Sequence, residues 1–415
     1  MSGEHGDGRR RRSRRRVLAA LAVGGLAGCL RLESQDDTAT STTAATSTVR
    51  ATADADTETE STETSGSTTV SAPPETDWPQ FQADAGNRGY VQDAVGPTES
   101  PDLAWQVNAG GDGAAVMDGV AYTGFDLTAV DAASGESLFE TYTGRTTPAV
   151  GDGVAFVGND DALVAVETDG GDTAWEVAVE GTVTAPTLAD GSVYVGAVDE
   201  YEDGFTVGVH AFDADDGSRR WLTETDVGVE RPVACDGDRV LAALGGRTLV
   251  ALDAGDGRER WRVDGVSRFS APTLVDDTVY IVGDGDRENA LLALDATDGS
   301  VQWSFALGGD GHVSPAVTED RVYVGTTEDQ AMYAVDRADG TRWWRASIDG
   351  WALGSPAVTA DTVYVGTRNG TVHALAVGDA AERFVVDLGS ETVASPAVAS
   401  GRLLVSTDRV TYAFE

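Results

Sequence analysis

Short apolar stretches and polar turns alternate along most of this chain, and one pattern returns about every forty residues. Residues 314–325 show it most clearly, with a short apolar stretch, an acidic turn, and a second stretch with apolar residues at Val322 and Val324. Alternation with a period of two is typical of β-strands, and the repeated units lack the 3.6-residue period of helices. The pattern therefore predicts an all-β chain of short strands joined by tight turns.

The repeated unit has a regular length. Seven units begin at a proline, and an eighth, residues 114–124, lacks it. Asp-Gly turns follow the first strand in several units, and this pair favours type I′ hairpins because both central positions need positive φ. Units of roughly 40 residues with four short strands are typical of β-propeller blades. The prolines are Pro148, Pro186, Pro232, Pro272, Pro315, Pro356 and Pro396.

Each unit also carries an aromatic residue at a fixed distance from its third strand. In six units an acidic residue ends that strand and the aromatic follows eight residues later, as in Asp253 and Trp261. The last unit, residues 393–415, stops after its third strand, and residues 103–107 with Trp105 can supply the fourth. Pairing strands from the two ends in one blade removes exposed sheet edges. We predict eight four-stranded antiparallel blades in a closed ring, with seven blades as the alternative.

This repeat pattern resembles that of a known family. Residues 251–257 with Trp261, and residues 293–299 with Trp303, resemble the tryptophan-docking repeat of pyrroloquinoline quinone (PQQ)-like β-propellers. Residues 78–81, Trp-Pro-Gln-Phe, resemble the segment that commonly precedes the first blade of that family. The resemblance covers residues 77–415 and implies that the tryptophans dock between blades. The expected docking residues are Trp105, Trp175, Trp221, Trp261, Trp303 and Trp344.

Residues 1–76 differ sharply from the repeats. Arginines fill most of residues 9–16, and the apolar run that follows, residues 17–30, is too short to span a bilayer. Arg14 and Arg15 fit the twin-arginine export pattern, and the Leu-Ala-Gly that precedes Cys29 resembles a lipobox. We therefore expect removal of residues 1–28, a lipid on Cys29, and a location on the outer face of the cell membrane. Residues 29–76 are rich in Thr, Ser and acidic residues, which predicts a disordered tether ahead of the propeller at residues 77–415.

The charge of the chain limits its partners. It carries 69 acidic and 29 basic residues, for a formal charge of −40, and every basic residue is Arg. This composition resembles that of proteins from extreme halophiles; an ordinary acidic secreted protein is the weaker alternative, because Lys is absent altogether. Self-repulsion of this size needs screening by salt. No basic stripe is present, which argues against nucleic acid as a partner.

The resemblance leaves two functions open, because the family includes quinoprotein dehydrogenases and non-catalytic lipoprotein scaffolds. Enzymes of the family typically have a vicinal Cys-Cys pair over the cofactor and a Glu, Asn and Asp set for Ca²⁺ and base. Cys29 and Cys235 are the two cysteines here, and with Cys29 lipidated no pair remains. We therefore predict no catalytic residues and no metal site. PQQ and Ca²⁺ enter only under the alternative, a dehydrogenase oxidising alcohols or sugars.

Residues that break the repeat are candidates for a binding site. Just before the prolines most units carry small or apolar residues, and the exceptions are charged, aromatic or histidine side chains that could face the mouth of the channel. Such arginines could hold a small anionic ligand; the alternative is local pairing, for example of Glu230 with a neighbouring Arg or of Arg145 with Asp152. We expect a monomeric, non-catalytic binding or protein-scaffolding module. The ligand candidates are Arg145, Glu230, Arg231, Arg268 and His312.

Overall fold

This computed structural model describes residues 48–50 and 76–415, except 142–143, 200–206, 246, 267–269, 285–288, 312 and 390–391. Arg14, Arg15 and Cys29 lie outside the described residues, as do Arg268 and His312. No helix long and apolar enough to span a membrane occurs in the part of the chain that the structure describes.

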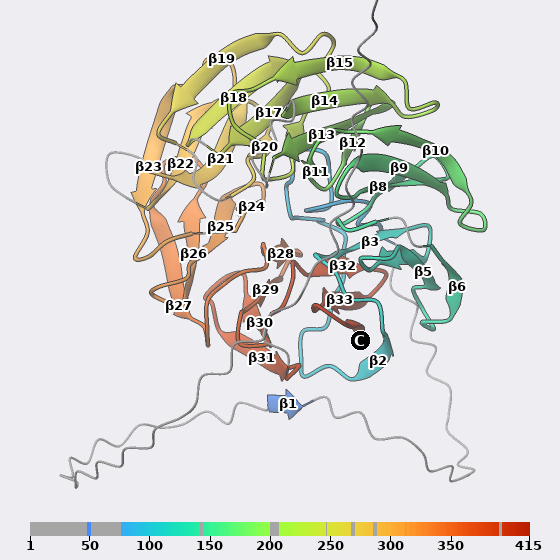
Figure 1. Cartoon of the computed structure of the whole chain (residues 1–415). Helices are drawn as coiled ribbons and strands as arrows, with labels where there is room; N and C mark the ends of the chain where they lie inside the picture. Colours follow the sequence, from blue (N-terminus) through green and yellow to red (C-terminus); the bar gives the residue numbers. More distant parts are fainter. Residues whose placement is uncertain are drawn as a thin grey trace, which may run out of the picture. The chain divides into compact units, whose positions relative to one another are not determined.

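The described chain forms eight four-stranded antiparallel blades around a ring, so the predicted eight-bladed β-propeller is confirmed (Figure 1). Seven of the blades run from an innermost to an outermost strand in chain order, and the eighth takes its outermost strand from near the start of the described chain. The first four blades are β3 (Ala114–Met117), β4 (Val120–Thr123), β5 (Thr128–Asp131) and β6 (Ser137–Glu140); β7 (Ala149–Gly151), β8 (Val154–Gly158), β9 (Ala162–Glu167) and β10 (Thr173–Ala178); β12 (Thr187–Ala189), β13 (Ser192–Val198), β14 (Gly208–Asp213) and β15 (Arg219–Glu224), with β11 (Thr182–Val183) also on β13; and β16 (Ala234–Cys235), β17 (Arg239–Leu244), β18 (Thr248–Asp253) and β19 (Glu259–Asp264).

The remaining four blades complete the ring. They are β20 (Thr273–Val275), β21 (Thr278–Gly283), β22 (Ala290–Asp295) and β23 (Val301–Ala306); β24 (Ala316–Val317), β25 (Arg321–Gly325), β26 (Ala331–Asp336) and β27 (Arg342–Ser347); β28 (Ala357–Val358), β29 (Thr362–Gly366), β30 (Thr371–Ala376) and β31 (Glu382–Asp387), with β1 (Thr48–Arg50) parallel to β31; and β32 (Ala397–Ala399), β33 (Arg402–Ser406), β34 (Thr411–Phe414) and β2 (Leu103–Val107).

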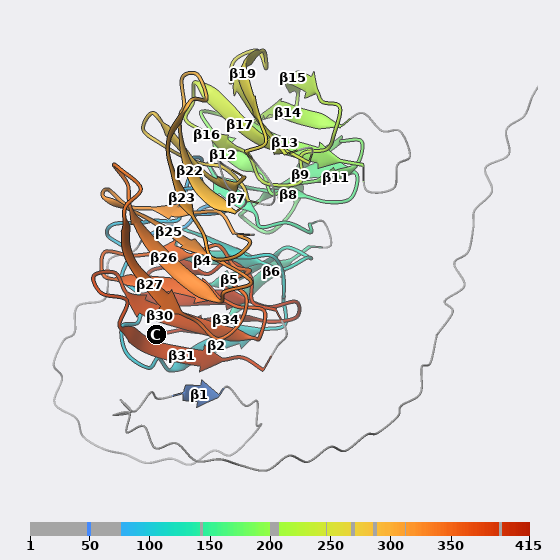
Figure 2. The same cartoon turned by 90° about the vertical axis from the view of Figure 1, so that its left-hand side faces the viewer.

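The eighth blade closes the ring as the sequence predicts. Its outermost strand, β2, pairs antiparallel with β34, so strands about 300 residues apart share one sheet. Figures 1 and 2 both show β2 beside the strands near the end of the sequence. This pairing leaves no blade with an incomplete edge in the ring.

Burial explains why each strand takes its position. The second and third strands of a blade are buried on both faces, and β9 is apolar at five consecutive buried positions. The outermost strand β10 alternates between exposed and half-buried positions instead. A sheet packed on both faces by neighbouring blades requires continuous apolar runs, whereas an outer strand needs only one apolar face.

Three of the four Asp-Gly hairpins have the predicted turn. At Asp118, Asp152 and Asp190, and at the glycine after each, φ is positive. In the fourth pair only Gly237 has positive φ, so the prediction of a type I′ turn is wrong there. The turn is shifted by one residue because the carboxylate of Asp236 accepts the backbone N–H groups of Asp238 and Arg239 at 3.1 and 2.8 Å.

Tryptophans join each blade to the next. All six of the expected docking residues donate their indole N–H to a backbone carbonyl of the following blade at 2.8–3.0 Å. The acceptor is always the residue after the position that ends the third strand. The pairs are Trp105 to Ala132, Trp175 to Ala214, Trp221 to Ala254, Trp261 to Ala296, Trp303 to Arg337 and Trp344 to Val377.

Residues 76–91, which we call the plug, run through the middle of the ring and bond to every blade. Trp78 exchanges two 2.8 Å backbone hydrogen bonds with Val116 of β3. Seven further contacts reach the innermost strands of the other blades or the turns that follow them, which no sequence pattern predicted. They join Pro79 to Val150, Gln80 to Leu188, Ala85 to Cys235, Gly86 to Leu274, Arg88 to Val317, Gly89 to Val358 and Thr76 to Ser400.

Candidate functional site

The residues that precede the prolines line a cavity of about 1080 Å³. All seven contribute to its wall, and the first blade, which lacks the proline, contributes Gly111 and Asp112. Because these residues precede the innermost strands of eight blades arranged in a ring, the cavity lies on the ring axis at the end where the chain enters each innermost strand. The seven residues are Thr147, Ala185, Arg231, Ala271, Ser314, Ser355 and Ser395.

The plug forms the floor of this cavity. Phe81 of the plug lines the cavity, and the neighbouring Pro79 accepts a hydrogen bond from Val150 of β7. Val150 lies three residues beyond Thr147, which corresponds to about 10 Å along a strand. The plug therefore occupies the axis below the pre-proline ring, and the cavity is a well that opens toward one face.

The well brings together three of the predicted ligand candidates. Arg145, Glu230 and Arg231 all line it. The guanidinium of Arg145 forms an ion pair with Asp160 at 2.7 Å, and both side chains are exposed. Local pairing of Arg145 therefore occurs, but with Asp160 rather than with Asp152.

Arg231 is the exception in a ring of otherwise small residues. Its Nε atom is buried and has no hydrogen-bond partner among the described residues. Burial lowers the pKa of its guanidinium, and the nearby carboxylates of Glu230 and Asp112 oppose this effect. Burial raises the pKa of the Asp112 carboxyl group, and the positive charge of Arg231 lowers it. These three side chains form one interacting charge cluster at the wall of the well.

The charges of the well do not favour the small anionic ligand expected from the sequence. Its described lining contains five carboxylates and two guanidiniums, and each guanidinium lies near at least one carboxylate. An anion that approached Arg231 would also meet Glu230 and Asp112, and would lose much of its attraction to the arginine. Part of this pairing could not be read from the sequence, because Asp112 belongs to another blade than Arg231.

Hydroxyl groups form a second polar layer that the sequence analysis missed. The Oγ atoms of Ser314, Ser355 and Ser395 each accept a backbone N–H from the preceding blade at 3.0 Å. A hydroxyl that accepts in this way keeps its own proton for donation. The recurrence of Ser before Pro in three successive units was the available signal.

Two aromatic side chains with large exposed fractions, one of which lines the well, are candidates for ligand contacts. Phe125, in the turn between β4 and β5, lines the well and is 40% exposed. Trp351, in the segment between β27 and β28, is also 40% exposed, and the guanidinium of Arg368 lies 5.1 Å from its ring centroid. Exposed aromatics beside a cavity are typical of binding surfaces.

Two buried histidines, His210 and His373, lie at equivalent positions on the third strands of their blades. His210 pairs with Val195 and His373 with Val365, the register that Tyr333 has with Val324. His373 accepts the N–H of Asp349 at Nε2, and its Nδ1 lies 3.3 Å from a carboxylate oxygen of Glu382. Burial lowers the pKa of His210 to about 4, and among the described residues neither of its ring nitrogens has a hydrogen-bond partner.

Metal ligands and cysteines bear on the PQQ and Ca²⁺ site that the resemblance implies for an enzyme. Among them, no three His, Cys, Asp or Glu side chains are grouped to hold a metal ion. Cys235 is buried in β16, away from the well lining, and its Sγ accepts the N–H of Gly237 at 3.3 Å. No step through a quinone is derived from this arrangement.

The fold and the well define this protein as an eight-bladed β-propeller with an axial cavity. A family described as outer membrane protein assembly factor BamB matches residues 102–227, 206–350 and 328–415. These matches cover more than half of the sequence, and the chain belongs to that family.

Comparisons with individual proteins point to the same repeat. BamB of Salmonella typhimurium is 32% identical over 174 residues, which are 39% of this chain and 41% of that protein. The serine/threonine-protein kinase AfsK of Streptomyces coelicolor is 32% identical over 142 residues, which are 33% of this chain and 15% of the kinase. The chain thus spans less than half the length of these curated relatives.

Solved structures share the fold at low identity. A quinohemoprotein alcohol dehydrogenase from Comamonas testosteroni superposes with a TM-score of 0.66 at 16% identity, over 81% of this chain and 80% of the enzyme. BamB from Moraxella catarrhalis gives 0.62 at 17% identity, over 76% of this chain and 100% of that chain. Because both identities are below 25%, the likeness concerns architecture and leaves activity open.

Proposed function

We propose that this protein is a non-catalytic binding and scaffolding module whose partner docks over the well. The observation that carries the proposal is the axial well itself, closed by the plug and bordered by Phe125. Concave cavities with a few convergent polar groups are the usual binding sites of proteins. Membership in a family named for an assembly factor supports a protein as the partner.

The proposal includes a location outside the cytoplasm, with the propeller held at the membrane by a lipid on Cys29. The sequence order of arginines, apolar run and Cys29 supports it. Fractionation of cells that make the Cys29→Ser variant tests the anchor. We expect the variant to leave the membrane fraction and the parent protein to stay there. Equal membrane retention of both proteins would contradict the anchor without affecting the binding role.

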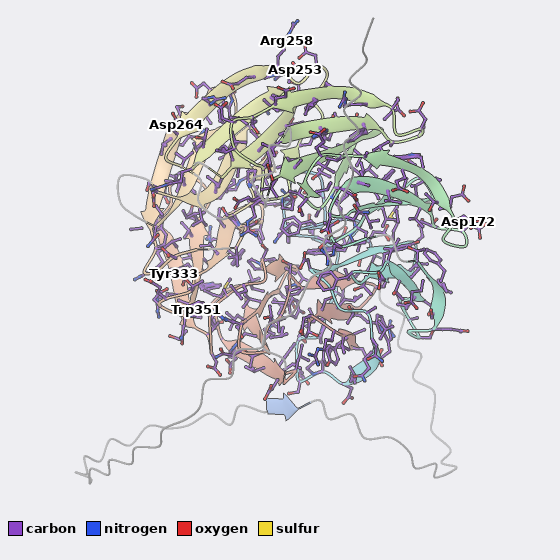
Figure 3. The ribbon with its side chains drawn as sticks, in the orientation of Figure 1. Asp172, Asp253, Arg258, Asp264, Tyr333 and Trp351 are labelled. Atoms are coloured by element: carbon purple, nitrogen blue, oxygen red, sulfur yellow. The ribbon has the colours of Figure 1, made fainter. Side chains whose placement is uncertain are left out.

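The docking surface is tested by capture of the partner with the full chain from its own membrane in concentrated salt. Phe125→Ala and Arg231→Gln alter the well, and Arg258→Gln is the matched control. Arg258 lies at the outer edge of the fourth blade beyond Asp253, and its side chain is 86% exposed (Figure 3). We expect both well variants to lose one specific captured protein that the control retains. Capture that is the same for all three variants would place the docking surface elsewhere.

A separate measurement tests whether the protein is non-catalytic. Adding PQQ with Ca²⁺ to the purified chain is expected to give no absorbance of bound cofactor and no dye reduction with alcohols or sugars. Cofactor binding together with dye reduction would overturn the non-catalytic role.

A further inference from the structure

Each arginine of the well lies near a carboxylate, which limits the ligand that can enter it. Arg145 is paired with Asp160, and Arg231 lies in the field of Glu230 and Asp112. The ratio of five carboxylates to two guanidiniums in the lining is close to the 69 to 29 of the whole chain. The lining therefore has three more carboxylates than guanidiniums, an excess that follows the composition of the whole chain and does not mark a dedicated cation or anion site.

Hydrogen-bond donors and acceptors stand side by side around the well. Carboxylates accept, guanidiniums donate, and the serine hydroxyls keep a proton to donate. The side-chain oxygen of Asn159 accepts the N–H groups of Asp161 and Ala162 at 3.0 and 2.7 Å, which leaves its amide N–H groups as donors. A ligand group that donates and accepts hydrogen bonds at the same time can pair with both kinds of side chain, and a hydroxyl is such a group.

The backbone around the well is poorly suited to a peptide strand. In seven blades a proline lies just before the innermost strand, and proline has no N–H to offer. Further along, the plug already uses backbone groups of the same strands, as in Val150 and Leu274. Side chains, rather than a free strand edge, are left for recognition.

Aromatic rings complete the surface. Phe81 lies at the floor and Phe125 at the open end, so a ligand in the well can contact two rings and the polar wall together. A sugar ring has an apolar face of C–H groups and an edge of hydroxyls, which matches this combination.

We propose that the well binds a neutral saccharide, the end of a glycan carried by the docked partner. This rests on the proposed binding role and adds the chemistry of the group that enters the well. The volume of about 1080 Å³ is at the upper end of the range of small-ligand pockets, so several sugar rings fit.

The test titrates the purified full chain in concentrated salt with neutral trisaccharides of glucose, mannose, galactose and N-acetylglucosamine. Trigalacturonate and the glucosamine trimer serve as anionic and cationic comparisons. We expect at least one neutral trisaccharide to bind with a Kd below about 1 mM by calorimetry. Both charged trimers should bind more weakly. Equal or tighter binding of a charged trimer would overturn the proposal. The same holds if no neutral trisaccharide binds at a concentration of about 10 mM.

Variants then locate the binding. Phe125→Ala and Arg231→Gln should each raise the Kd of the neutral trisaccharide about tenfold. Arg258→Gln and Trp343→Phe, both remote from the lining, should leave the Kd unchanged, and unfolding midpoints verify that all four variants fold. Unaltered affinity in both well variants would also overturn the proposal.

Partner capture separates this inference from the proposed function. If the well variants lose a protein partner while no saccharide binds, the partner inserts a protein segment and only the saccharide inference fails. If neither capture nor titration depends on the well, both fail. Release of the captured partner by excess neutral trisaccharide would support both.

Discussion

The indole N–H of Trp221 donates to the carbonyl oxygen of Ala254 in the next blade at 2.9 Å, and the ring also packs against Gly257. A Cβ atom added to Gly257 would lie 2.6 Å from Cε3 of Trp221, so the indole fits only against a bare backbone. One side chain thus couples two blades through a hydrogen bond and a close contact at once.

Loss of the indole N–H should weaken the coupling between blades. Trp221→Phe is expected to lower the free energy of unfolding by about 1–2 kcal/mol, because the ring is 8% exposed and the hydrogen bond is buried. Trp343→Phe is the matched control, since Trp343 makes a similar 2.9 Å bond to Gly378 but is 57% exposed. Its cost should be below about 0.5 kcal/mol in chemical unfolding. Equal costs would contradict a special role for the buried indole.

The turn that receives each indole offers a test in both directions. Gly257 has a φ of 72° and Ala380, at the equivalent position of the seventh blade, has 61°. Gly257→Ala should destabilise the fold by about 1–3 kcal/mol through backbone strain and the clash with Trp221. Ala380→Gly removes a Cβ from the same conformation and should stabilise by up to about 1 kcal/mol. Thermal unfolding midpoints should therefore move in opposite directions.

The plug should contribute to stability through its buried amide. The Nδ2 atom of Asn87 donates to Val233 at 3.1 Å and to Pro272 at 3.0 Å, which joins the fourth and fifth blades. Asn87→Ala is expected to cost about 2 kcal/mol, because the side chain is 1% exposed and the Pro272 carbonyl would lose this partner. Asn369→Ala, at an exposed turn, is the control and should change the unfolding free energy little. A neutral Asn87→Ala would show that the plug is only loosely held.

Acid should destabilise the third blade through His210. Burial lowers the pKa of its imidazole to about 4 in the folded protein, whereas an unfolded chain titrates near 6.5. Below pH 6.5 the unfolded chain binds a proton at this imidazole that the folded chain does not bind. The free energy of unfolding therefore falls until the pH reaches about 4. A shift of this size corresponds to about 3 kcal/mol in total.

His210→Phe isolates this effect because carboxylate titration is common to both proteins. The difference in unfolding free energy between variant and parent should grow in favour of the variant from pH 7 to pH 5. A pH-independent difference would assign the acid sensitivity to other groups.

The sequence predicted the fold because the repeat is local. Each blade carries its own turns, its own apolar strands and a Trp at a fixed distance, and Trp105 even indicated how the ring closes. The site was predicted in part, since Arg145, Glu230 and Arg231 broke the repeat and do line the well.

The rest depends on contacts between distant residues. Arg145 pairs with Asp160 across a turn and Arg231 interacts with Asp112 of another blade, so the ligand charge could not be judged from either arginine alone. Nothing in residues 78–81 shows that the chain from Thr76 to Val91 would turn through the axis, because its hydrogen-bond partners lie up to 324 positions away.

The plug and β2 have a consequence for how the protein is made. The eighth blade joins residues 103–107 to residues 411–414, and the plug needs the innermost strands of all eight blades as partners. A growing chain can form individual blades, but neither the closed ring nor a fully bonded plug can exist before the last strand has been synthesised. The final ring is therefore assembled after synthesis has passed residue 414, and a chain shortened by a few residues at that point would lose closure at both ends of the sequence.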